Sequence, residues 1–402
     1  MVSDISTLPV ELVEVIAYGL EPAELLSLRL ACRELNRKTF RCFGHAYFQT
    51  LRTNLSRESL QRLTEVSQHE HLRRCVKVLL IESSNNTGLG FLWNRHPSGH
   101  LVAPLPAVKT LREILGDKFV NCRSFRFHTF QFHSDYDAID LDQSAYLTTT
   151  DTIAIILTII AETGLPVESF HVDLNAFGGS PVDIKRLDIL PYQTPEFRAG
   201  WACLRELILG YTLSHEAVDW TVELILRASC LQKLELGHHF DDTIGLIFHR
   251  LLSAETLPRL EELSILKGRF TEELLSNLVL RFRDSLRILS LCSIVITPGG
   301  TWPAVFRAWR GSLPLLERIS VKHLRNRGPP KTHIIFPSLG DDPVRPETGG
   351  QRFFDLTHRE FGGEQAIVGV AYRGPSMKMA FEILVRSTTN EPRAPTPSMN
   401  QT

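Results

Sequence analysis

Residues 204–209, 231–236, 260–265 and 286–291 have the sequences LRELIL, LQKLEL, LEELSI and LRILSL. Each stretch carries apolar side chains at its first, fourth and sixth positions, so the last two share one face of an extended strand. Successive stretches start 27, 29 and 26 residues apart. A short and nearly constant period predicts repeated units that each contain one strand.

The same pattern continues in both directions along the chain. It begins again at Cys75, Cys122 and Val167 on the N-terminal side and at Leu316 on the C-terminal side. The early intervals are longer, and the Gly- and Pro-rich segments 85–106 and 173–201 fall within them. We therefore expect insertions that leave the repeated body at these two segments.

The segments between the predicted strands have helical spacing. Ser214, Asp241 and Thr271 are suited to cap three helices, and Trp309 belongs to a fourth. The side chains expected to face inward are Val218, Val222, Ile225, Leu226, Ile244, Ile247, Phe248, Leu251, Leu252, Leu274, Leu275, Leu278, Phe282, Val305 and Phe306. Strands that alternate with helices predict an α/β fold, with a parallel sheet on one side and helices on the other.

This pattern resembles leucine-rich-repeat proteins. The resemblance implies a curved solenoid with its strands on the concave side. Leucine-rich repeats often place Asn or Cys three residues after the last strand leucine, and Asn175 alone occupies that position here. We therefore expect an irregular horseshoe.

The N-terminal residues predict a different unit. Leu8 and Pro9 open short helices that would end near Gly19 and restart at Pro22, with apolar residues on more than one helix face. So small a unit cannot bury that many apolar side chains on itself, which favours docking to a second protein. The alternative is an ordinary three-helix cap that buries these leucines within the chain.

The pattern L-P-x-E-L-x-x-x-I-x-x-x-L-x-P-x-E-L-L-x-L-R-L-x-C-R-x-L over residues 8–35 resembles an F-box. The resemblance covers about residues 5–44, and Leu35 stands where many F-boxes have tryptophan. It implies binding to the Skp adaptor of Skp–cullin–F-box ubiquitin ligases. The residues that would form or support the adaptor-binding surface are Leu8, Pro9, Leu12, Ile16, Leu20, Leu25 and Leu26. Arg29, Arg33 and Arg37 are expected on a solvated face.

These features divide the chain into five parts. We expect an F-box module at 1–48, a helical linker at 49–72 and the leucine-rich-repeat-like body at 73–326. A C-terminal cap at 327–387 follows, with a closing strand at 366–372 and a helix at 375–386. The composition of 388–402 is typical of a disordered tail.

In such a solenoid the side chains between the buried strand positions face the concave surface, where partners usually bind. The predicted substrate-binding residues on that face are Arg126, His171, Asp173, Glu206, Lys233, Glu235, Glu262, Ser264, Ser290, Arg318 and Lys322, in a row that also includes Lys77. Its middle is acidic and its ends are basic, which suggests a substrate with a basic segment. The alternative is a solvated face without recognition value.

Bulk composition excludes several classes. A formal net charge of −1 gives no general attraction to nucleic acid or an anionic membrane. The most hydrophobic run, residues 153–161, is too short to span a bilayer. The seven cysteines contain no C-x-x-C pair, which is typical of reduced thiols in an intracellular protein. We therefore expect a cytoplasmic or nuclear protein.

The sequence shows no catalytic or cofactor motif. The patterns H-E-x-x-H, G-x-x-x-x-G-K-[ST] and G-x-S-x-G do not occur. His96 and His100 lie in a Pro- and Gly-rich stretch and are interpreted as surface-loop residues. We expect no enzyme activity, no cofactor and no metal. The expected function is the substrate-recognition subunit of a Skp–cullin–F-box ligase; the alternative is a leucine-rich-repeat scaffold that does not direct ubiquitination.

Overall fold

The computed structural model describes residues 5–84, 86–102, 105–129, 144–173, 182–183, 186–187, 190–210, 217–237, 242–327, 332–339, 353–361 and 364–392. The chain divides into two compact units, Met1–Trp201 and Ala202–Thr402. Each unit contains strands in parallel register together with helices, which confirms the predicted α/β class. Within the described ranges, no helix combines the length and apolar character that crossing a membrane requires.

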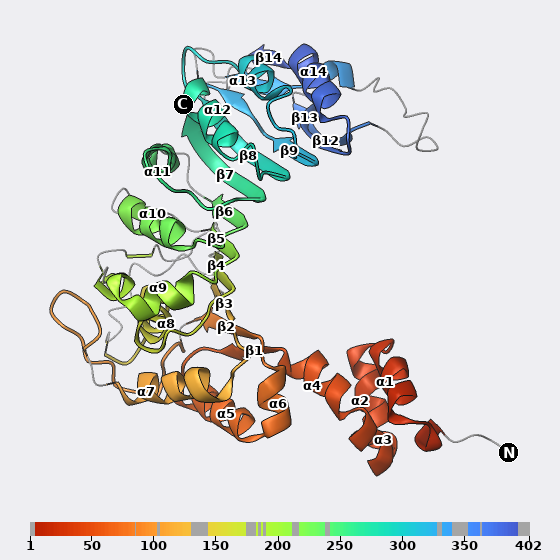
Figure 1. Ribbon diagram of the computed structural model, residues 1–402, viewed down its shortest axis with the longest axis vertical. Helices are drawn as coiled ribbons and strands as arrows, with labels where there is room; N and C mark the ends of the chain where they lie inside the picture. The colour runs from red at the N-terminus through yellow and green to blue at the C-terminus, as the bar shows by residue number, and fades with distance from the viewer. Residues whose placement is uncertain are drawn as a thin grey trace, which may run out of the picture. The chain divides into compact units, whose positions relative to one another are not determined.

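The first unit begins with a group of short helices and continues into a parallel sheet (Figure 1). Its strands are β1 (Thr50–Thr53), β2 (Val78–Ser83), β3 (Ser124–Thr129) and β4 (Ser169–Asp173), each parallel to the next. Its helices are η1 (Ile5–Thr7), α1 (Val10–Tyr18), α2 (Pro22–Ala31), α3 (Arg33–Lys38), α4 (Phe40–Phe48), α5 (Arg57–Gln68), α6 (Glu70–Cys75), α7 (Pro106–Glu113), the π-turn η2 (Ile114–Lys118), α8 (Thr149–Thr163), η5 (Leu190–Gln193) and α9 (Pro195–Trp201).

The second unit repeats a strand–helix alternation. Its parallel strands are β5 (Glu206–Gly210), β6 (Lys233–Gly237), β7 (Glu262–Phe270), β8 (Ile288–Ile296) and β9 (Arg318–Lys322), paired in this order. The helices between them are α10 (Ala217–Arg227), α11 (Thr243–Leu252), α12 (Glu272–Arg281) and α13 (Trp302–Trp309). In Figure 1 these helices lie along one side of the strands.

The C-terminal end of the second unit adds β10 (Arg325–Asn326), which pairs parallel with β8, and further elements whose strands pair antiparallel. The further elements are β11 (Thr332–Ile335), η6 (Pro337–Leu339), β12 (Asp355–Phe361), β13 (Glu364–Arg373), α14 (Met377–Ser387) and β14 (Thr389–Pro392). Strand β13 pairs antiparallel with both β12 and β9, so it ends the parallel series. The predicted closing strand and terminal helix are therefore confirmed in β13 and α14.

The boundary predicted for the disordered tail was wrong at its beginning. Residues 389–392 form β14, which pairs antiparallel with β11. Backbone pairing with an open strand edge orders this stretch in spite of its polar composition. Residues 393–402 lie outside the described residues.

Seven of the eight predicted strand patterns have the expected buried triplet. In the pattern that starts at Leu231, for example, Leu231, Leu234 and Leu236 are all buried. The first pattern was placed one residue too early, because Val76, Leu79 and Ile81 are buried while Cys75 is half-buried. Register confirms the shift, since Leu79 and Ile81 lie beside the buried Phe125 and Phe127 of β3.

The segment predicted as a helical linker contains a strand as well as helices. Strand β1 pairs parallel with β2, with Thr53 opposite Ile81. The buried position of β1 is occupied by Thr53, whose hydroxyl lies 2.9 Å from the Ser59 hydroxyl. The predicted pattern requires apolar residues at the buried strand positions. Because β1 has a threonine at this position, the pattern does not detect the strand.

A left-handed residue recurs after the buried strand positions. Lys267, Ser293 and His323 have φ values of 61°, 59° and 54°, and each comes seven residues after the start of its pattern. Lys267 and Ser293 lie at the same register, between the pairs Leu266–Cys292 and Gly268–Ile294. In a regular strand, residues three positions apart lie on opposite faces. Ile265 and Gly268 are three positions apart and both are buried, so the left-handed residue between them shifts the alternation of the strand by one residue.

Most predicted helices form on the expected faces. The Thr271 hydroxyl accepts a hydrogen bond from the Leu274 backbone N–H at 3.0 Å, which confirms Thr271 as a cap. Most of the predicted inward side chains are buried; Leu226, Leu252 and Leu274 are half-buried. The predicted caps Ser214 and Asp241 lie outside the described residues.

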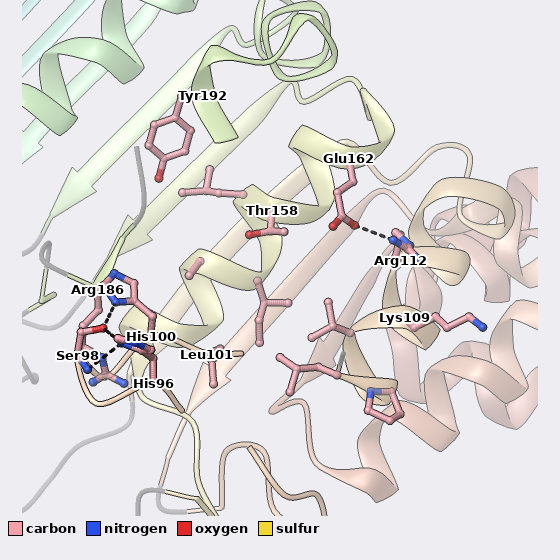
Figure 2. Close-up of a pocket in the computed structure, with 16 residues that line it drawn as sticks. His96, Ser98, His100, Leu101, Lys109, Arg112, Thr158, Glu162, Arg186 and Tyr192 are labelled. Atoms are coloured by element: carbon pink, nitrogen blue, oxygen red, sulfur yellow. Dashed lines mark hydrogen bonds and ion pairs between the residues drawn. The ribbon is translucent and has the colours of Figure 1, made fainter. Parts of the chain in front are cut away.

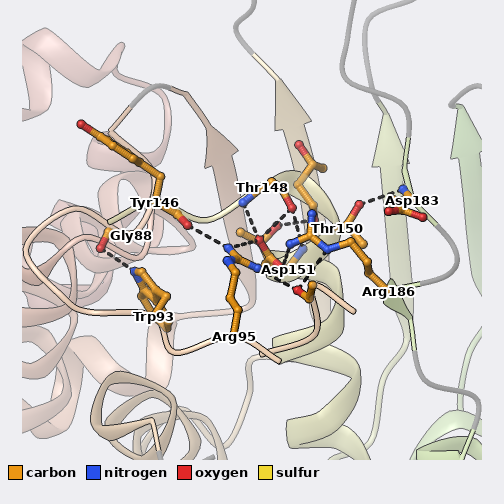
Figure 3. A network of polar contacts seen from close by, with 12 residues as sticks. Gly88, Trp93, Arg95, Tyr146, Thr148, Thr150, Asp151, Asp183 and Arg186 are labelled. Atoms are coloured by element: carbon orange, nitrogen blue, oxygen red, sulfur yellow. Dashed lines mark hydrogen bonds and ion pairs between the residues drawn. The ribbon is translucent and has the colours of Figure 1, made fainter. Parts of the chain in front are cut away.

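A buried ion-pair network holds part of the insertion at 85–106 against α8 (Figure 3). The Asp151 carboxylate accepts hydrogen bonds from Arg95 and from Arg186, each at 2.8 Å, and the Asp151 side chain is only 3% exposed. The Thr148 backbone N–H donates to the same carboxylate at 2.7 Å, as in a capping box at the start of α8. The Gly99 carbonyl accepts from both guanidinium groups. These contacts therefore hold this part of the insertion against the interior of the first unit.

Candidate functional site

The N-terminal helices have a small core of their own. Ala17 of α1, Leu25 of α2 and Cys42 of α4 are each 2% exposed and pack together. The Tyr47 hydroxyl donates to the Pro22 carbonyl at 2.6 Å. These contacts join the three helices although none is longer than ten residues.

Lys38, the last residue of α3, fixes the start of α1. The Lys38 ammonium donates to the carbonyls of Ser6 and Leu8, both at 2.8 Å, and the Lys38 side chain is only 10% exposed. Leu8 and Pro9 are thereby fixed at the point where the helix begins, with Pro9 at its N-cap position. Helix α2 has its own capping box, formed by Glu21 and Glu24.

The module leaves large apolar side chains in contact with solvent. Leu12 and Ile16 of α1 are 51% and 40% exposed, and Leu26 of α2 is 40% exposed. Further exposed apolar residues, which were not among the predicted adaptor-binding residues, are Val10, Val15, Tyr18 and Leu30. Leu12 and Ile16 are four residues apart, as are Leu26 and Leu30, so each pair lies together on its helix.

The remaining predicted adaptor-binding residues have different environments. Leu8 and Leu20 are half-buried and Pro9 is exposed. Leu25 is buried in the module's core, so it supports the surface and does not form it. Adjacent leucines at 25 and 26 therefore have opposite roles, which the sequence pattern does not distinguish.

The prediction of one solvated arginine row was wrong. Helix α2 ends at Ala31 and α3 begins at Arg33, because Cys32 is extended with φ −160° and ψ 162°. The Arg29 guanidinium lies 3.6 Å from the centre of the Phe43 ring, and burial lowers the pKa of Arg29. Arg29 thus packs inside the module, while Arg33 and Arg37 are exposed.

The predicted substrate-binding residues of the first unit lie on adjacent strands. Arg126 of β3 is exposed and stands beside the half-buried His171 of β4. The His171 ring Nε2 lies 2.7 Å from the Ser169 hydroxyl. The backbone of Asp173 lies beside His128, and the Asp173 side chain lies outside the described residues.

The second unit brings three predicted charges into one row across its strands. Glu206, Lys233 and Glu262 are neighbours in register on β5, β6 and β7. The Lys233 ammonium lies 2.8 Å from the Glu206 carboxylate and 3.8 Å from the Glu262 carboxylate. The hydrogen bond to Glu206 raises the pKa of Lys233. Lys233 thus offsets part of the negative charge that the sequence pattern indicates here.

A second row lies one pleat further along the strands. It contains Glu235, Ser264 and Ser290 in register, and Ser264 is only 7% exposed. Arg318 and Lys322 of β9 lie beyond these strands, and Arg318 stands beside Arg373 of β13. Among the predicted residues of the second unit, the acidic ones lie on β5, β6 and β7 together with Lys233, and the other basic ones lie on β9.

The described part of the chain contains no group of His, Cys, Asp and Glu side chains that could hold a metal ion. Burial raises the pKa of Cys122 to about 12, which suppresses its nucleophilic thiolate. Compared with known proteins, the chain matches no family model and no curated protein sequence.

Proposed function

We propose that this protein is a substrate-recognition subunit of a Skp–cullin–F-box ubiquitin ligase. The N-terminal helices would bind the Skp adaptor, and the strand face of the repeated units would hold a protein substrate. The single observation that carries the proposal is the exposure of Leu12, Ile16 and Leu26. These residues belong to the F-box-like pattern and lie outside the buried core formed by Ala17, Leu25 and Cys42.

Exposed side chains of this size favour a partner. Fully burying an exposed leucine or isoleucine side chain contributes about 1.5–3 kcal/mol, and covering the exposed part of Leu12, Ile16 or Leu26 contributes roughly half of that. The alternative three-helix cap requires these side chains to be buried within the chain, whereas they remain 40–51% exposed. A docking module fits this arrangement better, because a partner supplies the missing cover.

We further propose that the strand–helix units belong to a degenerate leucine-rich-repeat solenoid. The recurring buried triplets and the left-handed residues at Lys267, Ser293 and His323 support the proposal. Repeats of this kind bind partners through their strand face. The ligase subunit would then act by holding a substrate close to the ubiquitin-charged enzyme, without chemistry of its own.

The decisive experiment measures binding of the purified full chain to the purified Skp adaptor. We expect Leu12→Glu and Leu26→Glu each to weaken binding by about tenfold or more, because each places a charge in an apolar contact. Val120→Glu is the matched control, since Val120 is 55% exposed and lies outside the N-terminal helices. Failure of the unaltered chain to bind the adaptor, or equal binding by all three variants, would refute the proposal.

Association with the cullin separates a receptor from a scaffold. A receptor brings the cullin to the chain through the adaptor, whereas a scaffold without ligase function does not. We expect the cullin to co-purify with the unaltered chain and to be lost with Leu12→Glu. Adaptor binding without cullin association would favour the scaffold.

The substrate surface has a test of its own. If a basic segment binds the second unit, Glu235→Lys will weaken substrate binding, because it reverses a half-buried charge on the strand face. Glu206 and Glu262 are poorer choices, since reversing either one also breaks its contact with Lys233. Unchanged substrate capture by Glu235→Lys would leave the acidic strands without a recognition role.

A further inference from the structure

The first unit contains a cleft on its helical side with a volume of about 1060 Å³ (Figure 2). It is formed by residues 96–101 and Leu105 of the insertion, by α7 and by α8, with Arg186 and Tyr192 completing its wall. A volume near 1000 Å³ is at the upper end of the range for small-molecule sites. Nothing in the proposed docking to an adaptor or a substrate uses this cleft.

Most of the cleft surface between its ends is apolar. The residues that form it are Leu101, Leu105, Val108, Ala154, Ile155 and Leu157. Three of these come from α8 and the others from the insertion and α7, so different elements converge on one apolar surface. A ligand that fits here needs an apolar body.

The charged side chains and the two imidazoles lie toward two ends, with Thr158 between them, as Figure 2 shows. At one end the Ser98 hydroxyl lies between two imidazoles, 2.7 Å from His96 Nδ1 and 2.9 Å from His100 Nδ1, with Arg186 close by. At the other end Arg112 donates to Glu162 at 2.8 Å. Glu162 is the sole carboxylate among the described residues that line the cleft.

Among the described side chains, the first of these ends carries more positive than negative charge. Arg186 lines the cleft and shares the buried Asp151 carboxylate with Arg95. Among the described residues, two guanidinium groups therefore meet one carboxylate at this end. At the opposite end Arg112 pairs with Glu162, and the other cation there, Lys109, is exposed to solvent. An anionic group is favoured where Arg186 and the two imidazoles meet, because it would offset the second guanidinium charge.

The same network holds the site in shape before any ligand arrives. Arg95 donates to the Gly99 carbonyl at 3.1 Å, and the Arg186 Nε–H donates to it at 3.2 Å. Two backbone hydrogen bonds close the segment 96–100: the His96 N–H donates to the His100 carbonyl at 2.8 Å, and the Gly99 N–H donates to the His96 carbonyl at 2.7 Å. A rigid wall reduces the entropy that binding must overcome.

We propose that this cleft binds a small amphipathic anion, with an apolar body along α8 and a carboxylate or phosphate head at His96, Ser98, His100 and Arg186. The charge excess at that end sets the sign of the head, and the apolar surface sets the character of the body. The site is independent of the proposed ligase function, because it lies outside the N-terminal helices and off the strand face.

The test is calorimetric titration of the full chain with dodecanoate below its micelle concentration. Dodecyltrimethylammonium is the matched probe, because it has the same alkyl chain and the opposite charge. We expect saturable micromolar binding of dodecanoate and at least about tenfold weaker binding of the cation. Equal binding of the two probes, or no saturable binding of dodecanoate, overturns the proposal.

Two variants locate the site. His96→Ala with His100→Ala removes ring nitrogens at the head end and is expected to weaken dodecanoate binding about tenfold. Its control is His69→Ala with His249→Ala, since both of those residues are exposed and neither lines the cleft. Thr158→Phe fills the middle of the cleft and is expected to abolish binding.

Circular dichroism and melting temperature confirm that each variant is folded. Unchanged dodecanoate binding by the His96/His100 pair overturns the proposal even if the Thr158 variant fails to fold. Titration with dodecyl phosphate then distinguishes the two heads: the tighter of the carboxylate and the phosphate identifies the class of natural ligand.

Discussion

The left-handed residue in the middle of β8 offers a sharp test of how the strands are built. Ser293 has φ 59°, and its neighbour in register, Lys267, has φ 61°. For a residue with a Cβ, the left-handed conformation costs roughly 1–2 kcal/mol. Glycine removes this cost, but it raises the entropy of the unfolded chain by an amount worth about 0.4–1 kcal/mol. We therefore expect Ser293→Gly to stabilise the second unit by about 0.5–1 kcal/mol.

Ser290 is the matched control, because it is a half-buried serine on the same strand. Its backbone is extended, so glycine there has only the entropic penalty and is expected to destabilise by about 0.5–1 kcal/mol. Urea unfolding gives the global change, and hydrogen exchange of the β7–β9 amides gives the local one. If Ser293→Gly destabilises as much as Ser290→Gly, the left-handed position stores no strain and the reasoning is wrong.

Three further changes follow from the structure. Asp151→Asn leaves two buried guanidinium groups without their counter-charge and is expected to destabilise the first unit by about 3–5 kcal/mol, measured by urea unfolding. Burial is the largest cause of the lowered pKa of His323, and the positive charges of three basic neighbours lower it further. The unfolded chain then takes up the proton first, so stability falls as the pH drops below about 6.5. His323→Asn, which also tolerates the left-handed backbone, is expected to flatten this part of the stability–pH curve; an unchanged slope contradicts it. Leu25→Ala is expected to destabilise the N-terminal helices by about 2–5 kcal/mol, and Leu26→Ala by less than about 0.5 kcal/mol. Hydrogen exchange of the backbone amides in these helices measures both effects. Equal exchange in the two variants would show that Leu25 is not a core residue.

Strands were predictable where the sequence alternates. In LQKLEL at 231–236, a polar residue separates Leu234 from Leu236, so one strand register alone buries both of these leucines. The stretch CVKVLLI at 75–81 has several apolar residues in succession, and two registers are compatible with it. Contact with Phe125 and Phe127 of β3 selects Leu79 and Ile81 as the buried pair.

The candidate sites were less predictable. The sequence identifies the apolar N-terminal pattern, but the distinction between buried Leu25 and exposed Leu26 depends on where α1 and α4 pack. Strand alternation places Glu206 and Lys233 on one face, and pairing of β5 with β6 then brings their charges to 2.8 Å. The cleft was missed altogether, because His96 and His100 resemble surface-loop residues when only their neighbours in sequence are considered.

The sequence by itself determined the strand period, the alternation with helices and the apolar excess of the N-terminus, because these depend on residues within a few positions of one another. Only the tertiary structure decided which leucines face solvent and how charge is balanced. Arg95 and Asp151 are 56 residues apart in the chain and 2.8 Å apart in space. The physical reason is that burial and ion pairing depend on which segments come into contact after folding, and a local sequence pattern does not specify these long-range contacts.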